Sequence, residues 1–145
     1  MTLLHDAKRP LAIAVNGYAV KTVASGASVA DFVASLSSQR QREECGTLLE
    51  MMRRITGHEA AMWGATIVGF GRYRYQRKDK SEHEFFRVGF SPRKTALTVY
   101  VMPGFDAYEP LLATLGRHKR SVACLYLPTL ADVDLGVLEE LLALS

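Results

Sequence analysis

The sequence predicts an α+β domain in which an antiparallel sheet of four to five strands packs against helices. Two observations favour this class. Apolar residues recur at helical spacing up to residue 56, and from residue 67 to residue 101 they alternate with the period of two that half-buried strands show. The 145 residues are 48% hydrophobic and 23% charged, which is typical of one folded domain. We expect this single domain to span residues 21–145, after an N-terminal extension of residues 1–20 without clear periodicity.

Two helices are expected in the first half of the domain. Ser28 and Asp31 have the spacing of a capping box, and one face of the helix that follows is formed by Val29, Phe32, Val33 and Leu36. A second helix is expected from about residue 41 to residue 56, with a buried stripe of Cys45, Leu48, Leu49, Met52 and Ile55. Gly57 is a natural end for this helix.

Three strands are expected next, and their short connections favour antiparallel pairing. The first covers residues 67–75, with Val68 and Phe70 on one face and, on the other, Gly69, Gly71, Tyr73 and Tyr75. The second covers residues 86–90, with Phe86, Val88 and Phe90 sharing a face, and the third covers residues 97–101. A turn at residues 91–94 joins the last two strands, because proline suits the second position of a type I turn.

The C-terminal part is expected to add a helix, a strand and a final helix. The first of these helices covers about residues 109–115, with Pro110 in its first turn, and Gly116 ends it. A fourth strand is expected at residues 121–127. Asp132 or Asp134 caps the final helix, whose buried face is Leu138, Leu141 and Leu142.

Charge is unevenly distributed along the chain. The formal net charge is +3, but residues 72–120 hold eleven Lys or Arg against five Asp or Glu, so the remainder is net −3. A basic middle of this kind could attract an anion, an acidic partner or nucleic acid. The commoner interpretation of such a charge run is a solvated hairpin surface. A pI near 9.0 is only marginally basic, and tyrosines outside a recognised module are weak evidence, so we do not expect nucleic acid as the partner.

The cysteines and the apolar runs indicate an intracellular protein. Cys45 and Cys124 are far apart and form no Cys-x-x-Cys pair, so we expect two buried thiols. The apolar run at residues 11–15 is too short for a signal sequence or a membrane span. We therefore expect a cytoplasmic protein without membrane contact.

Seven motifs, from about Lys21 to the end of the chain, resemble the YdhG-like family, which is described as a domain of unknown function. They are Met62-Trp63-Gly64, Val68-Gly69-Phe70-Gly71, Tyr73-x-Tyr75, Val88-Gly89-Phe90-Ser91-Pro92-Arg93-Lys94, Leu115-Gly116-x-His118-Lys119, Cys124-Leu125-Tyr126 and Asp132-Val133-Asp134. The chain departs from the family pattern before Lys21 and at Arg120–Ser121, where a glycine-containing turn is expected. The resemblance implies a small cytosolic α+β domain with no established reaction, and one branch is described as frataxin-like, with a role in iron delivery.

Iron handling would require surface carboxylates, because hard oxygen ligands suit labile iron. The candidates are Glu43, Glu44, Glu50, Asp132, Asp134, Glu139 and Glu140. Arginines lie among the glutamates of the expected second helix and would oppose cation binding. The histidines lack the spacing of metal ligands. The other interpretation of these acids is a solvated helix surface and a helix cap.

No set of residues in the sequence has the spacing of a known type of catalytic site. Ser91 lies in a predicted turn without the glycines of a nucleophile elbow, and the Gly69-Phe70-Gly71 segment leads into more strand, where a dinucleotide loop requires a helix. Asp132 and Asp134 are too close in sequence for paired acid–base chemistry. We therefore expect a protein that is not an enzyme.

A binding site is the remaining hypothesis. Glycines on a strand make room for a ligand or another backbone, and Trp63 with the Arg93–Lys94 turn would add an aromatic floor and a cationic rim. The alternative is that Trp63 is in the core and that the glycines relieve crowding against a covering helix. We also expect four cations to converge at one end of the sheet, since both connections that carry them lie outside the strands: Arg93, Lys94, Arg117 and Lys119.

The predicted ligand-binding residues are therefore Trp63, Gly69, Gly71, Tyr73, Arg93, Lys94, Arg117 and Lys119. The function expected from them is non-enzymatic binding of a small ligand or a protein partner, without a cofactor. Frataxin-like iron binding and delivery is the alternative.

Overall fold

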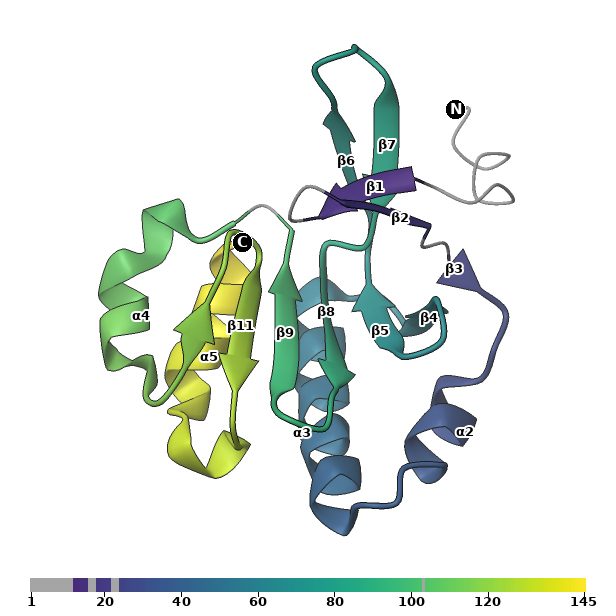
Figure 1. The fold of residues 1–145 in the computed structure, drawn as a ribbon. Coiled ribbons are helices and arrows are strands. Elements are labelled where there is room, and N and C mark those ends of the chain that lie inside the picture. Colours follow the sequence, from purple (N-terminus) through teal and green to yellow (C-terminus); the bar gives the residue numbers. More distant parts are fainter. Residues whose placement is uncertain (1–11, 16–17, 22–23, 103) are drawn as a thin grey trace.

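The structure is a computed structural model, and it describes residues 12–15, 18–21, 24–102 and 104–145. The described residues form helices and antiparallel sheets, which confirms the α+β class. Figure 1 shows helices α3 (Gln39–Thr56) and α5 (Leu135–Leu144) behind one face of the sheet. The other face, turned away from these helices, is called the outer face below.

The main sheet has seven strands within the described residues, in the order β10-β11-β9-β8-β5-β4-β3, and every neighbouring pair is antiparallel. The strands are β3 (Ala24–Ser25), β4 (Ala61–Trp63), β5 (Ile67–Phe70), β8 (Val88–Pro92), β9 (Leu97–Val101), β10 (Lys119–Arg120) and β11 (Cys124–Leu127). The sequence predicted four to five strands. The excess comes from the two-residue edge strands β3 and β10, which are too short to show a period.

Two hairpins lie outside this sheet. One joins β1 (Ala12–Val15) to β2 (Tyr18–Lys21), and the other joins β6 (Tyr73–Gln76) to β7 (Glu82–Phe85). Of the predicted N-terminal extension, residues 1–11 and 16–17 are outside the described residues, and the rest lies in the first hairpin.

The predicted capping residues are confirmed, but α3 begins at Gln39 and not near residue 41, because Ser38 caps it, and Leu36 lies beyond the end of the first helix. Ser28 accepts from the Asp31 amide (3.1 Å) before α2 (Val29–Ala34), and Gly57 ends α3 in the left-handed region, with φ 69°. Helix α4 (Glu109–Leu115) follows the short helix η1 (Asp106–Tyr108), and Gly116 follows α4. Asp134 caps α5 by accepting from the Val137 amide (3.2 Å), after the short helix η2 (Leu130–Asp132).

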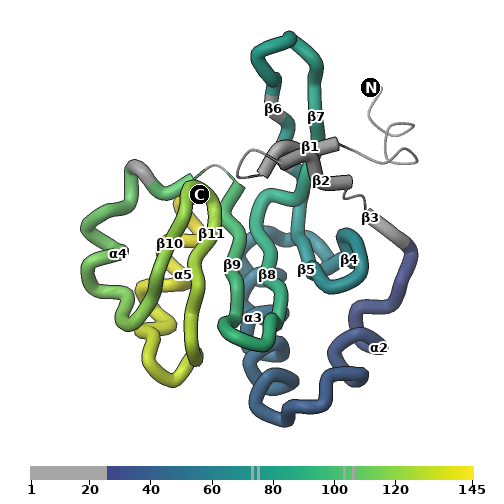
Figure 2. Tube along the Cα trace, in the orientation of Figure 1, coloured from purple at the N-terminus to yellow at the C-terminus, as the bar shows by residue number. Residues whose placement is uncertain are grey.

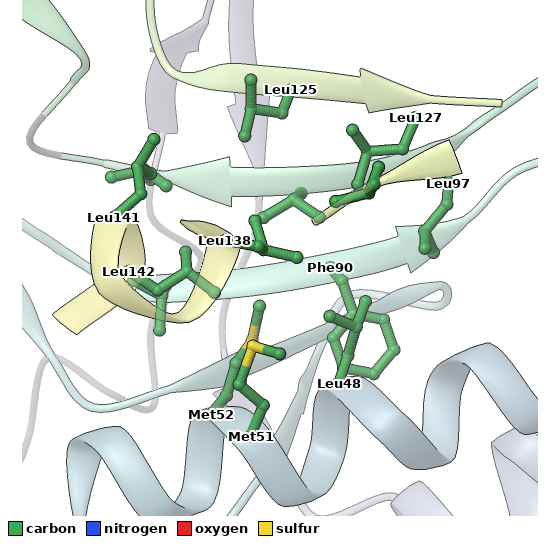
Figure 3. Packing of buried hydrophobic residues seen from close by; sticks show 14 of the residues in the cluster. Leu48, Met51, Met52, Phe90, Leu97, Leu125, Leu127, Leu138, Leu141 and Leu142 are labelled. Atoms are coloured by element: carbon green, nitrogen blue, oxygen red, sulfur yellow. The ribbon is translucent and has the colours of Figure 1, made fainter. Parts of the chain in front are cut away.

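The main core fills the space between the sheet and these helices. Figure 3 shows Leu48, Met51 and Met52 of α3 facing strand residues such as Phe90, together with the leucines of α5: Leu138, Leu141 and Leu142. The carboxylate of Glu44 is buried at the edge of this core. It accepts hydrogen bonds from the Leu130 amide (2.9 Å) and the Thr129 hydroxyl (3.2 Å), so it fastens α3 to η2.

The predicted continuous strand over residues 67–75 is wrong. Strand β5 ends at Phe70, Gly71 takes φ 70°, and β6 begins at Tyr73 in a different sheet. The return strand breaks at the same level, where the Arg87 amide donates to the Phe70 carbonyl (3.0 Å) between β7 and β8. The β6–β7 hairpin therefore leaves the main sheet and extends beyond its end (Figure 2).

Two further boundaries differ from the prediction. Residues 91 and 92 belong to β8, and the turn to β9 is at residues 93–96, closed by the Arg93 amide and the Ala96 carbonyl (3.2 Å). The predicted strand 121–127 is shorter, because β11 begins only at Cys124. The first difference matters for the outer face, since it places Arg93 directly after the end of a strand.

Candidate functional site

An aromatic cluster covers the middle of the outer face. Phe86 packs edge-to-face against Trp63 (5.6 Å between ring centroids) and against Tyr100 (5.7 Å), and Phe85 packs against Trp63 (5.5 Å). All four side chains are buried, together with Cys124. The break between β7 and β8 is the cause, because it turns Phe86 onto the outer face while Val88 and Phe90 point into the main core. The prediction that Phe86 shares their face is therefore wrong.

Phe86 fills the space that the strand glycines open. A Cβ added to Gly69 would lie 2.7 Å from the Cβ of Phe86 and 2.7 Å from the Trp63 ring. A Cβ on Gly89 would lie 2.9 Å from the Phe86 ring and 2.5 Å from the Val68 carbonyl oxygen. These glycines relieve crowding, as one of the two interpretations expected, but the covering group is an aromatic side chain and not a helix.

The predicted site is divided into two hollows by this cluster. The first, the Arg72 hollow, has a volume of about 480 Å³ and is lined by His58, Glu59, Ala61, Trp63, Gly69, Gly71 and Arg72. The Arg72 guanidinium already has partners within the protein. It lies 5.8 Å from the Trp63 ring centroid and forms an ion pair with the buried Glu84 carboxylate at 2.5 Å. The charge of Arg72 is therefore balanced within the protein.

The second hollow, the Arg93 hollow, has a volume of about 360 Å³ and is lined by Arg93, Thr95, Ala96, Thr98, Tyr100, Cys124 and Tyr126. Its floor comes from two neighbouring strands. In the register of β9 and β11, Thr98 is opposite Tyr126, and Tyr100 is opposite Cys124. Directly opposite residues project on the same face of a sheet, so these four side chains form one patch.

Hydrogen-bonding groups in the Arg93 hollow are incompletely paired. The Arg93 guanidinium donates to the Tyr100 hydroxyl (3.4 Å), and the Tyr126 hydroxyl is 3.3 Å from that of Ser121. The Thr98 hydroxyl is buried, with the residue 2% exposed, and has no hydrogen-bond partner among the described residues. Burial raises the pKa of Tyr100 above its ordinary value, although the bond from Arg93 acts in the opposite direction. Tyr100 is therefore a neutral hydroxyl group at pH 7.

The four predicted cations lie at one end of the sheet, but they do not form one cluster. The 93–96 turn and the connection from α4 to β10 are at the same end (Figure 2). Arg93 lines the hollow, and Lys119, opposite Tyr126, projects on the same face one strand further out. Lys94 is exposed in the turn, and Arg117 lies 3.8 Å from the Asp132 carboxylate.

The other predicted ligand-binding residues do not lie in the Arg93 hollow. Trp63, Gly69 and Gly71 line the Arg72 hollow, away from Arg93. The backbone of Tyr73 pairs with Phe85 in the β6–β7 hairpin, outside the main sheet. The sequence analysis missed Thr98, Tyr100, Cys124 and Tyr126. The alternation of β9 already separates Thr98 and Tyr100 from the core residues, but the pairing with β11 is needed to bring the two strands together.

The candidate iron ligands have other partners. Arg54 binds Glu139 (2.9 Å) and lies 3.7 Å from Glu50, while Glu43 accepts from Gln39 (3.2 Å). Glu44 and Asp134 are the capping groups described above. Within the part of the chain that the structure describes, no group of three or more His, Cys, Asp or Glu is placed to hold a metal ion.

Comparisons of the chain with protein-family models, with curated proteins and with solved structures found no match. The resemblance to the YdhG-like family therefore stays a prediction. Among the described helices, none combines the length and the apolar character that crossing a bilayer requires.

Proposed function

We propose that this protein binds a small organic anion in the Arg93 hollow and that it is not an enzyme. The observation that carries the proposal is the buried, unpartnered Thr98 hydroxyl in the same hollow as the Arg93 guanidinium. A buried hydroxyl without a partner costs about 1–3 kcal/mol. A ligand oxygen between Thr98 and Arg93 removes that cost and receives a charged hydrogen bond as well.

The charges around the hollow favour an anion with a single negative charge. Arg93 supplies one positive charge, and no carboxylate is among the described residues that line the hollow. The Tyr100 oxygen accepts from Arg93, so its own proton is available for a ligand oxygen. A carboxylate matches this set, because a guanidinium binds its two oxygens side by side.

The volume and the lining residues of the hollow favour an anion whose remaining part is small and apolar. Its volume of about 360 Å³ is near the lower end of the range of about 300–1,000 Å³ for small-molecule sites. The rings of Tyr100 and Tyr126, the Ala96 methyl group and the Cys124 thiol provide apolar contact. A small aromatic or branched carboxylic acid satisfies both requirements, and a protein partner would need a wider surface.

Binding of this kind fits a cytoplasmic protein, which is the compartment we propose. Cys45 and Cys124 are both unpaired thiols, and thiols persist where disulfides are kept reduced. Frataxin-like iron delivery is not favoured by any observation within the described residues, and it stays a prediction of the family resemblance.

A thermal-shift series tests the proposal. Benzoate, acetate, sulfate and phosphate are added to the wild type, to Arg93→Gln and to the matched control Lys94→Gln, which removes a neighbouring charge outside the hollow. Benzoate should raise the melting temperature of the wild type and of Lys94→Gln, and Arg93→Gln should lose most of the shift. Equal shifts in all three proteins would indicate a general salt effect and contradict the site.

A further inference from the structure

Cys124 carries a nucleophilic thiol, which the proposed binding uses only for apolar contact. It lies on the floor of the Arg93 hollow, opposite Tyr100, and it is 5% exposed. Cys45 provides a comparison within the same chain, because it lies in the main core between α3 and the sheet and is 0% exposed. The two thiols therefore differ in one respect that matters for chemistry, which is access through a hollow.

A second feature indicates that molecules enter this hollow. Thr98 also lines the hollow, beside the strand that carries Cys124, and its buried hydroxyl has no hydrogen-bond partner among the described residues. An entering molecule with an acceptor oxygen would be oriented by Thr98 and by Arg93, whose guanidinium reaches Tyr100, the neighbour of Cys124 across the strands. Its remaining atoms would then lie over the thiol.

We propose that Cys124 is a thiol-exchange site for small anionic disulfides. This inference rests on the proposed function for the part played by Arg93. A carboxylate of the disulfide binds Arg93, and the Cys124 thiolate, after losing its proton to solvent, attacks the nearer sulfur. A bond forms between Sγ and that sulfur, the original S–S bond breaks, and the other half leaves as a thiolate. Cys124 is oxidised to a mixed disulfide, the departing half is reduced, and an added thiol reverses the step.

Three disulfides of similar size and different charge test this inference. They are dithiodiglycolate (anionic), bis(2-hydroxyethyl) disulfide (neutral) and cystamine (cationic). Intact-mass measurements follow adduct formation on the full chain. Each rate is divided by the rate of the same disulfide with N-acetylcysteamine, an uncharged thiol, which removes differences in intrinsic reactivity. We expect one adduct per native chain, located at Cys124 by peptide mapping, with the anionic reagent favoured over the neutral one by about fivefold.

The variants separate this inference from the proposed function. Cys124→Ser should form no adduct in the native state, Arg93→Gln should remove the preference for the anionic reagent, and Lys94→Gln should keep it. Absence of an adduct on the native protein, or labelling at Cys45, would overturn the exchange site even if benzoate binds. A Cys124 adduct that forms equally fast with all three reagents would also overturn it, because the anionic selectivity is part of the proposal.

Discussion

Phe86 lies directly over Gly69, with its Cβ 2.7 Å from the position that a Cβ on the glycine would occupy. The sequence left open whether glycine on this strand makes room for a ligand or for packing. The contact shows that the chain fills the space itself, with an aromatic residue seventeen positions later in the same long hairpin. The hollow available to a ligand lies further along the outer face, beside Arg93.

Gly69→Ala should therefore destabilise the protein. The added methyl group meets both Phe86 and Trp63 at 2.7 Å, and overpacking of this kind costs about 1–3 kcal/mol. Urea denaturation measures the free energy of unfolding. Gly46→Ala, at an exposed position of helix α3 where an added Cβ meets nothing within 4 Å, is the control and should stabilise by about 0.5–1 kcal/mol. An unchanged stability in Gly69→Ala would mean that Phe86 can move aside.

Trp63→Ala should cost about 3–5 kcal/mol, the range for removing a large buried aromatic side chain. Trp63 is 2% exposed and contacts the rings of Phe85 and Phe86 edge-to-face. Circular dichroism must follow unfolding, since Trp63 is the single tryptophan of the chain. A loss below about 1 kcal/mol would contradict its place in the aromatic cluster and favour a ligand-binding surface there.

Thr98→Val should raise stability and weaken ligand binding at once. The substitution removes a buried hydroxyl without a partner, which should stabilise the protein by about 1 kcal/mol. Ser91, opposite Thr98 on β8, is the matched control, because its buried hydroxyl donates to the Thr66 carbonyl (2.7 Å). Ser91→Ala should therefore destabilise. If Thr98→Val behaves in the same way, its hydroxyl has a partner and the main support for the site is lost.

Cys45 should make the protein less stable at alkaline pH. Burial, with a smaller contribution from the Glu44 charge, raises the pKa of this thiol from 9.0 to about 11. The unfolded chain therefore loses the proton first, so the stabilisation is complete below pH 9 and disappears as the pH rises to about 11. Cys45→Ala should show a shallower decrease of the unfolding free energy in this range. Parallel curves for the two proteins would contradict the buried, neutral thiol.

Local capping and periodicity were sufficient to predict most helices and the fold class. Ser28, Gly57 and Asp134 act through neighbours three or four residues away, so their roles can be predicted without knowledge of the fold. The buried stripes of α3 and α5 are also confirmed in their main residues, since a helix with one apolar face must turn that face to the core.

The kink in the long hairpin could not be predicted in this way. Gly71 was counted as a strand residue, because alternation alone does not distinguish an extended glycine from one with φ 70°. The opposite break at Phe86–Arg87 has no local signal, since both residues are ordinary strand formers. That break moves Phe86 to the outer face and divides the predicted site into two hollows.

The composition of the Arg93 hollow depends on strand order. Arg93 was predicted as a binding residue because it is a cation near a turn, and it lines the hollow. Thr98, Tyr100, Cys124 and Tyr126 become neighbours only when β11 pairs with β9, across about two dozen intervening residues. Long-range pairing of this kind is decided by packing of the whole domain, and no spacing in the sequence indicates it.

The most direct test of an anion site at Arg93 is an amide NMR titration of the ¹⁵N-labelled protein with benzoate. Benzamide, which is uncharged and of similar shape, is the control compound. Saturable shifts should appear in residues 93–100 and 124–126 with benzoate, and they should be weak with benzamide. Arg93→Gln should weaken the benzoate affinity about tenfold or more, while Lys94→Gln should not change it. Saturable shifts centred on the Arg72 hollow, or equal shifts with the two compounds, would contradict an anion site at Arg93.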